Sequence, residues 1–143
     1  MPTLIRSQAD GWTVASETAQ IEWRTADTWE SGLPLLLSAD LEPLPEYKSA
    51  SAIAIEFPAF NDGRALSLAV LLRTRLNYAG ELRAVGAVHE DILHYMVRCG
   101  FDAIEIPDER DVQTALALIS PYSNVYQGSV TNPEPSFRRM QRG

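Results

Sequence analysis

The sequence predicts a single α/β domain built on an open parallel sheet of four to six strands with flanking helices. Short apolar segments alternate with amphipathic segments across residues 51–120, at short and even spacing. This β-α-β-α-β-α order is typical of parallel strands joined by right-handed helical crossovers. A chain of 143 residues is also too short for a complete (β/α)8 barrel, which needs roughly 200 residues or more.

The regular core contains three expected strands and three expected helices. The strands are short apolar runs rich in β-branched residues, at residues 51–58, 81–88 and 102–107. The helices show apolar side chains at helical spacing, at residues 63–78, 89–99 and 108–120. Polar residues that can cap these helices and glycines that can end them lie at the expected boundaries: Asn61 or Asp62, Asp108, Gly80 and Gly100.

The first fifty residues are expected to be an irregular N-terminal part of the same domain, which would span residues 1–128. The segment "ADGWTV" predicts a turn between short strands, and residues 33–38 read as a buried strand. Residues 25–32 fit either a short helix or a loop. Residues 123–129 are a candidate for a last strand, and residues 129–143 are expected to form a flexible C-terminal tail.

Composition and charge exclude several classes of function. Hydrophobic residues make up 45% of the chain and charged residues 22%, with a net charge of −7. This acidity argues against nucleic acids and anionic membranes as partners. The chain shows neither a signal-peptide pattern nor an apolar stretch long enough for a membrane span. With Cys99 as the only cysteine, these features predict a cytoplasmic protein without a disulfide.

Ligands of parallel α/β folds bind at the carboxyl ends of the strands, which here selects three loops, at residues 60–64, 88–91 and 107–110. Each loop opens a helix whose free N–H groups face the same edge. In the first loop, Arg64 is a candidate to hold an anion, with Asp62 orienting it. Alternatively, Asp62 only caps the helix and Gly63 allows a tight turn. The candidate ligand-binding residues at this edge are Asp62, Gly63, Arg64, Ser67 and Asp91.

Other reactive side chains favour structural interpretations. His89 is either a general base or a surface residue at a helix start. His94 lies off its helical face, so no metal site is predicted. Cys99 lies late in a helix on its apolar stripe, which favours a buried, inert thiol. Arg83 is expected to pair with a carboxylate on a neighbouring strand, such as Glu105 or Glu56. The chain lacks a dinucleotide-binding or P-loop motif, so no bound cofactor is expected.

The segments "FNDGRALSLAVLLR", "GELRAVGAV", "ED" and "RCGFDAIEI" together resemble a bacterial family, domain of unknown function 934, most strongly over residues 50–107. The chain departs from the family pattern near Ala87, His89 and Ile92, so His89 is not expected to be a family-wide catalytic base. The positions that match the pattern are Phe60, Asp62, Gly63, Arg64, Ser67, Arg73, Leu82, Arg83, Gly86, Asp91, Arg98, Cys99, Gly100 and Phe101.

The resemblance implies a role in assimilatory sulfite reduction, because genes of this family tend to lie beside those for sulfite reductase. It brings no catalytic residues. Three hypotheses follow. The first is a non-catalytic accessory protein that acts with sulfite reductase. The second is a small enzyme or binding protein for an anionic metabolite, such as a sulfur oxyanion or a nucleotide, held by Arg64. The third is an oxidoreductase that uses a bound flavin or a partner's cofactor.

Overall fold

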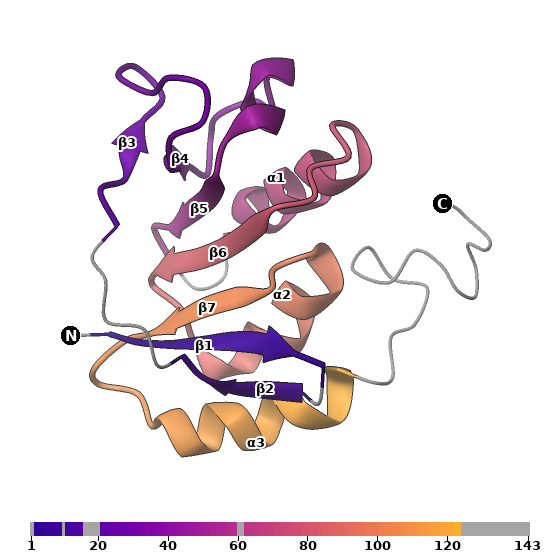
Figure 1. The fold of residues 1–143 in the computed structure, drawn as a ribbon. Coiled ribbons are helices and arrows are strands. Elements are labelled where there is room, and N and C mark those ends of the chain that lie inside the picture. The colour runs from indigo at the N-terminus through magenta and orange to yellow at the C-terminus, as the bar shows by residue number, and fades with distance from the viewer. Residues whose placement is uncertain (1, 10, 16–20, 60–61, 124–143) are drawn as a thin grey trace.

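A single sheet of seven strands carries the fold, in the order β2-β1-β7-β6-β5-β4-β3 (Figure 1). The computed structural model describes residues 2–9, 11–15, 21–59 and 62–123. Five neighbouring strands run parallel: β3 (Arg24–Thr25), β4 (Leu35–Ser38), β5 (Ala52–Phe57), β6 (Glu81–Gly86) and β7 (Ala103–Ile106). The predicted α/β class with a parallel sheet is therefore confirmed.

The N-terminal part is more regular than the sequence suggested, and it makes the sheet wider than expected. Strands β1 (Thr3–Gln8) and β2 (Gly11–Val14) form an antiparallel hairpin. Strand β1 then pairs antiparallel with β7, so that Thr3 lies opposite Ile106. These partners lie far apart in sequence, and local periodicity carries no information about such pairing.

Three α-helices and two short 3-10 helices complete the described fold. The helices are α1 (Gly63–Thr74), α2 (Leu93–Cys99) and α3 (Val112–Ser123), with η1 (Pro45–Ser49) before β5 and η2 (Glu90–Ile92) before α2. Helices α1 and α2 connect β5 to β6 and β6 to β7. The chain adds β5, β6 and β7 to the sheet one after another, each beside the last. Right-handed crossovers therefore place both helices on the same face, which lies behind the sheet in Figure 1. Buried side chains of the central strands pack towards them, including Ile53, Ile55, Phe57, Leu82 and Ile104.

Some helix boundaries differ from those expected. Helix α1 ends at Thr74 instead of residue 78, and α2 begins at Leu93 after the 3-10 turn η2. Helix α3 begins at Val112, because the Asp111 carboxylate, not that of Asp108, accepts the N–H of Gln113 at 3.2 Å. Residues 26–32 form turns and loop after β3, so the loop alternative is confirmed for this segment. The expected strand at 123–129 and the tail at 129–143 lie almost entirely outside the described residues.

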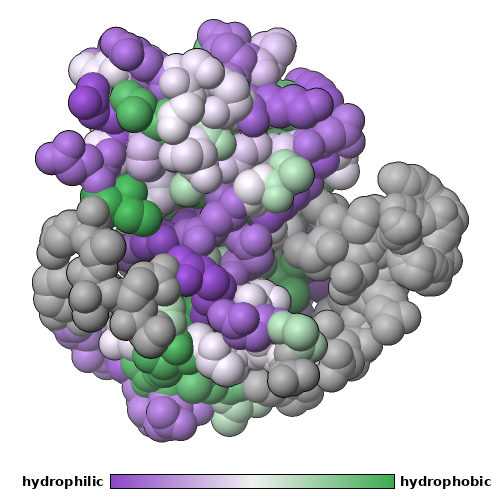
Figure 2. Space-filling view, viewed as in Figure 1, coloured by the Kyte–Doolittle hydropathy of each residue, from purple (hydrophilic) through white to green (hydrophobic). Residues whose placement is uncertain are grey.

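The face of the sheet opposite the helices carries a charged cluster. Arg83 is only 6% exposed, and it donates hydrogen bonds to Glu81 at 2.8 Å and to Glu105 at 3.2 Å. Arg6 bonds the other oxygen of Glu81 at 2.9 Å, and the Arg83 guanidinium lies over the Trp23 ring. Figure 2 shows hydrophilic residues gathered across the middle of this face. The expected pairing of Arg83 with Glu105 is confirmed, so Arg83 ties β6 to β7.

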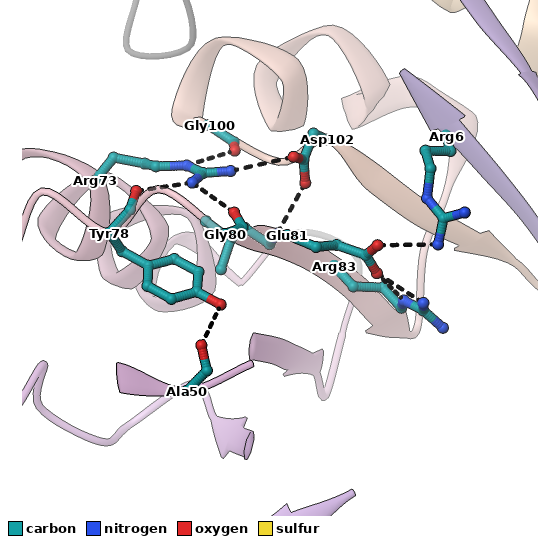
Figure 3. A network of polar contacts seen from close by, with 10 residues as sticks. Arg6, Ala50, Arg73, Tyr78, Gly80, Glu81, Arg83, Gly100 and Asp102 are labelled. Atoms are coloured by element: carbon teal, nitrogen blue, oxygen red, sulfur yellow. Dashed lines mark hydrogen bonds and ion pairs between the residues drawn. The ribbon is translucent and has the colours of Figure 1, made fainter. Parts of the chain in front are cut away.

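Arg73 connects two loops at the amino edge of the parallel strands, the one before β6 and the one between α2 and β7 (Figure 3). Its guanidinium donates to the carbonyl oxygens of Gly100, Tyr78 and Gly80 at 2.8–2.9 Å. It also lies 3.6 Å from the carboxylate of Asp102, whose other oxygen accepts the N–H of Leu82 at 2.8 Å. Burial raises the pKa of Asp102, and the hydrogen bond from Leu82 and the charge of Arg73 oppose that rise. Arg73 therefore supplies hydrogen-bond donors to backbone carbonyls that lie in loops, outside the hydrogen bonding of helices and strands.

Tyr78 gives this network a measurable alkaline transition. Burial raises the pKa of Tyr78 to about 12, although the nearby Arg73 charge opposes the shift. Because the folded pKa lies above the unfolded value near 10.0, the contribution of Tyr78 to stability is complete below that value and is lost as the pH rises through about 12. We expect ultraviolet titration of the parent to show the ionisation of Tyr78 as the tyrosine transition at the highest pH. Tyr78→Phe should lack this transition. A transition near 10 for this phenol would contradict its burial.

Candidate functional site

The start of α1 combines a helix cap with an oriented arginine. The carboxylate of Asp62 accepts the backbone N–H of Arg64 at 2.9 Å, so Asp62 is the N-cap of α1. The same carboxylate accepts hydrogen bonds from the Arg64 guanidinium, from Nε at 3.1 Å and from Nη2 at 2.8 Å. Asp62 therefore caps the helix and also holds Arg64 in one orientation, whereas the binding of an anion by Arg64 stays a prediction.

Arg64 keeps hydrogen-bond donors available despite this pairing. A guanidinium has five N–H donors, and Asp62 takes one from Nε and one from Nη2. The Arg64 side chain is 64% exposed. The hydrogen bond from Arg64 lowers the pKa of Asp62, and in turn Asp62 raises the pKa of Arg64, with a smaller contribution from Asp40. Arg64 is thus a fixed cation whose remaining hydrogens face solvent.

The pairing of Asp62 with Arg64 predicts an acid dependence of stability. Because the folded pKa of Asp62 lies below its usual value of 3.8, its contribution is present above that value and is lost as the pH falls through the folded pKa. We expect Asp62→Asn, which keeps a capping side chain, to melt below the parent at neutral pH. The difference should shrink as the pH falls below 3.8 and through the folded pKa of Asp62. A difference that stays constant in acid would exclude the ion pair as its cause.

A groove runs along α1, and we call it the α1 groove. It lies between one side of α1 and the loop at residues 39–43, and its volume is about 550 Å³. Three of the expected ligand residues, Gly63, Arg64 and Ser67, line it. The other residues that line the groove are Ala39, Leu41, Glu42, Pro43, Leu68, Leu71 and Arg75. The structure thus places Gly63 and Arg64 of the first predicted loop on a concave surface, which is where ligand sites usually occur.

The second and third predicted loops form a separate group at the same edge of the sheet. Asp91 donates its backbone N–H to Nδ1 of His89 at 3.0 Å, so His89 caps η2. Arg110 from the third loop lies 3.6 Å from the carboxylate of Glu90. The Asp91 carboxylate is 73% exposed and lies 3.5 Å from His89. The contacts described for Asp91 are with His89, whereas those described for Arg64 are with Asp62. These contacts place the two predicted ligand residues in separate clusters.

Cys99 has the environment of a structural thiol. It lies at the end of α2, is partly buried, and packs against the hydrophobic core. Burial raises the pKa of the Cys99 thiol, although the adjacent Arg98 opposes the shift. A thiol with a raised pKa is protonated at neutral pH and is a poor nucleophile. Within the described ranges, no group of three His, Cys, Asp or Glu side chains is arranged to hold a metal ion.

Several other positions of the family pattern also have structural roles. Gly100 adopts the left-handed conformation that ends α2, with φ of 114°. Phe101 is fully buried and packs against Phe57 at a ring distance of 5.8 Å. Gly86 has φ of 91° and lies against the backbone of Phe57. Phe60 lies outside the described residues. Of the matching positions, Arg64 and Ser67 are the ones that reach the α1 groove with polar side chains.

Sequence reasoning did not identify the remaining part of the groove. One side of α1 carries Ser67, Leu71 and Arg75 at intervals of four residues, which places them on one face of the helix. This spacing is a signal in the sequence from which that side of the groove could have been predicted. The opposing side, including Leu41 and Pro43, comes from a loop more than twenty residues earlier. That pairing depends on β4 lying beside β5, which the local pattern does not reveal.

Fold and site together define an α/β protein with helices on one face of a largely parallel sheet and a groove along its first helix. The chain belongs to the family described as bacterial protein of unknown function, DUF934, which matches residues 35–137. The predicted family membership is therefore confirmed. Comparison with curated proteins and with solved structures finds no match. Among the described helices, none has the length and hydropathy required to span a bilayer.

Proposed function

We propose that this protein is a non-catalytic accessory protein of assimilatory sulfite reduction and acts in the cytoplasm with sulfite reductase. One structural observation carries the non-catalytic part: the reactive side chains near the carboxyl edge have local structural partners. Asp62 pairs with Arg64 and caps α1, and His89 accepts a backbone N–H through Nδ1. These contacts give Asp62 and His89 the structural role of helix caps, and this arrangement supports binding rather than turnover.

The pathway part rests on the family. Membership in DUF934 is established, and the resemblance implies genes that lie beside those for sulfite reductase. A protein that assembles with the reductase, or helps electrons reach it, needs a binding surface more than a reaction centre of its own. The α1 groove supplies such a surface at one side of α1.

Growth of a deletion strain tests this proposal. We expect the strain to grow poorly on sulfate and on sulfite, and to recover fully on sulfide or cysteine. Recovery on sulfite would place the protein before the sulfite step and would contradict the proposal. Normal growth on sulfate, together with a pull-down that recovers no sulfite reductase from cells grown on sulfate, would also contradict it.

A second candidate function is the binding of a small anion, because Arg64 and Ser67 lie together on the α1 groove. The guanidinium hydrogens not used by Asp62 suit an oxyanion. Sulfite, sulfate or a nucleotide sulfate should then raise the melting temperature of the parent protein, and Arg64→Ala should abolish the rise. Arg24→Ala, at an exposed arginine on β3, is the matched control. An unchanged melting temperature of the parent with all three anions would exclude this candidate.

A further inference from the structure

His89 caps η2 through a ring nitrogen that must carry no proton. The backbone N–H of Asp91 donates to Nδ1 of His89 at 3.0 Å, and this bond forms the cap at the start of η2. A ring nitrogen accepts a hydrogen bond only while it is unprotonated, because both nitrogens of an imidazolium are donors. The capped form therefore has a neutral ring with its one proton on Nε2.

The same nitrogen lies close to two carboxylates that favour the charged ring. Nδ1 of His89 is 3.5 Å from Oδ2 of Asp91 and 3.9 Å from Oε1 of Glu90. The His89 side chain is 19% exposed, so solvent screens these charges only in part. A protonated Nδ1 has a hydrogen to donate to either carboxylate, and the opposite charges attract. The neutral and the charged ring thus have different partners at one atom.

The remaining charges around the ring come from the next two elements, because α2 and α3 both pack against η2. Arg110 contacts the cluster, since its Nη1 lies 3.6 Å from Oε1 of Glu90. A protonated His89 competes with Arg110 for that oxygen, which couples the loop after β6 to the loop after β7. The titratable side chains in the first turn of α2 and directly before α3 are His94, Tyr95, Asp108, Glu109, Arg110 and Asp111.

We propose that the loop between β6 and α2 is a proton-driven conformational switch. With a neutral ring, Nδ1 of His89 accepts the N–H of Asp91, and η2 is capped. When Nδ1 takes up a proton from solvent, the cap is lost and the new N–H donates to the carboxylate of Asp91 or Glu90. The ion pair of Glu90 with Arg110 then weakens. The Asp91 carboxylate, 73% exposed in the capped form, turns from solvent towards the ring, which changes the charge presented at the carboxyl edge.

Nuclear magnetic resonance of the full chain tests this switch over roughly pH 5 to 8, the range in which histidine ordinarily changes charge. At the upper end, the ring nitrogen shifts of His89 should show the Nε2–H tautomer. On acidification, the amide proton of Asp91 should move upfield as it loses its acceptor, with the same midpoint as the ring. The side-chain Nε signal of Arg110 should follow it. His94→Gln, which removes the other histidine of the chain, should leave these changes intact.

His89→Asn is the decisive variant, because asparagine caps helices with a side chain that does not titrate. In this variant the amide proton of Asp91 should keep one position across the whole range. A neutral His89 ring protonated on Nδ1 in the parent, or an Asp91 amide that stays constant while the ring titrates, would overturn the inference. An Asp91 amide that still moves in His89→Asn would also overturn it. No partner protein enters the experiment, so its outcome is independent of the proposed function.

Discussion

Replacement of Arg73 by alanine is expected to lower the free energy of unfolding by about 3 kcal/mol. The side chain is 11% exposed and donates to the carbonyls of Gly100, Tyr78 and Gly80. Alanine leaves these carbonyls without their charged donor and removes the cation beside Asp102. Urea denaturation followed by circular dichroism measures the loss.

Two further variants separate the geometry of Arg73 from its charge. Arg73→Lys keeps the charge but cannot reach several carbonyls with one ammonium group, so we expect a stability between those of the parent and Arg73→Ala. Arg75→Ala, two positions later on an exposed side chain, should stay within about 0.5 kcal/mol of the parent. If Arg73→Ala were as stable as Arg75→Ala, the network of Figure 3 would not contribute to stability.

Replacement of Gly86 by alanine is expected to cost about 3 kcal/mol or more, because strain and a collision act together. Gly86 has φ of 91°, and a Cβ atom there would lie 2.7 Å from the carbonyl oxygen of Phe57. That oxygen also accepts the N–H of Ala87 at 2.9 Å, so it is not free to move. The ends of β5 and β6 would have to separate.

Gly63→Ala is the matched control for this prediction. Gly63 opens α1, and a Cβ atom there meets nothing within 4 Å. Alanine at a compatible position reduces the freedom of the unfolded chain, so this variant should be at least as stable as the parent. Thermal denaturation of both variants measures the difference. A Gly86→Ala protein that melts with the parent would contradict the close approach of β5 and β6.

The parallel core could be predicted from the sequence because local patterns determine it. The apolar run at Ala52–Phe57 and the capped start of α1 at Asp62 are both local signals. The position of β1 beside β7 could not be predicted, because it depends on contacts between distant segments. The start of α3 was misplaced, since both Asp108 and Asp111 are able to cap a helix and tertiary structure selects Asp111.

The candidate site was also predictable only in part. The contact between Asp62 and Arg64 is local, and the sequence indicated it. The role of Arg73 could not be predicted, because the carbonyls that it binds belong to turns formed by later residues. The loop that faces α1 across the groove likewise depends on the order of the strands.

The most direct test of the proposed function is a titration of the purified full chain against purified sulfite reductase holoenzyme by isothermal calorimetry. The account predicts a saturable complex with a defined stoichiometry, and a dissociation constant at least about tenfold larger for Leu71→Asp than for Arg24→Ala. It also predicts no turnover of sulfite by the chain alone. The absence of binding heat, with no complex in sedimentation at the same concentrations, would contradict the claim that this protein acts with sulfite reductase.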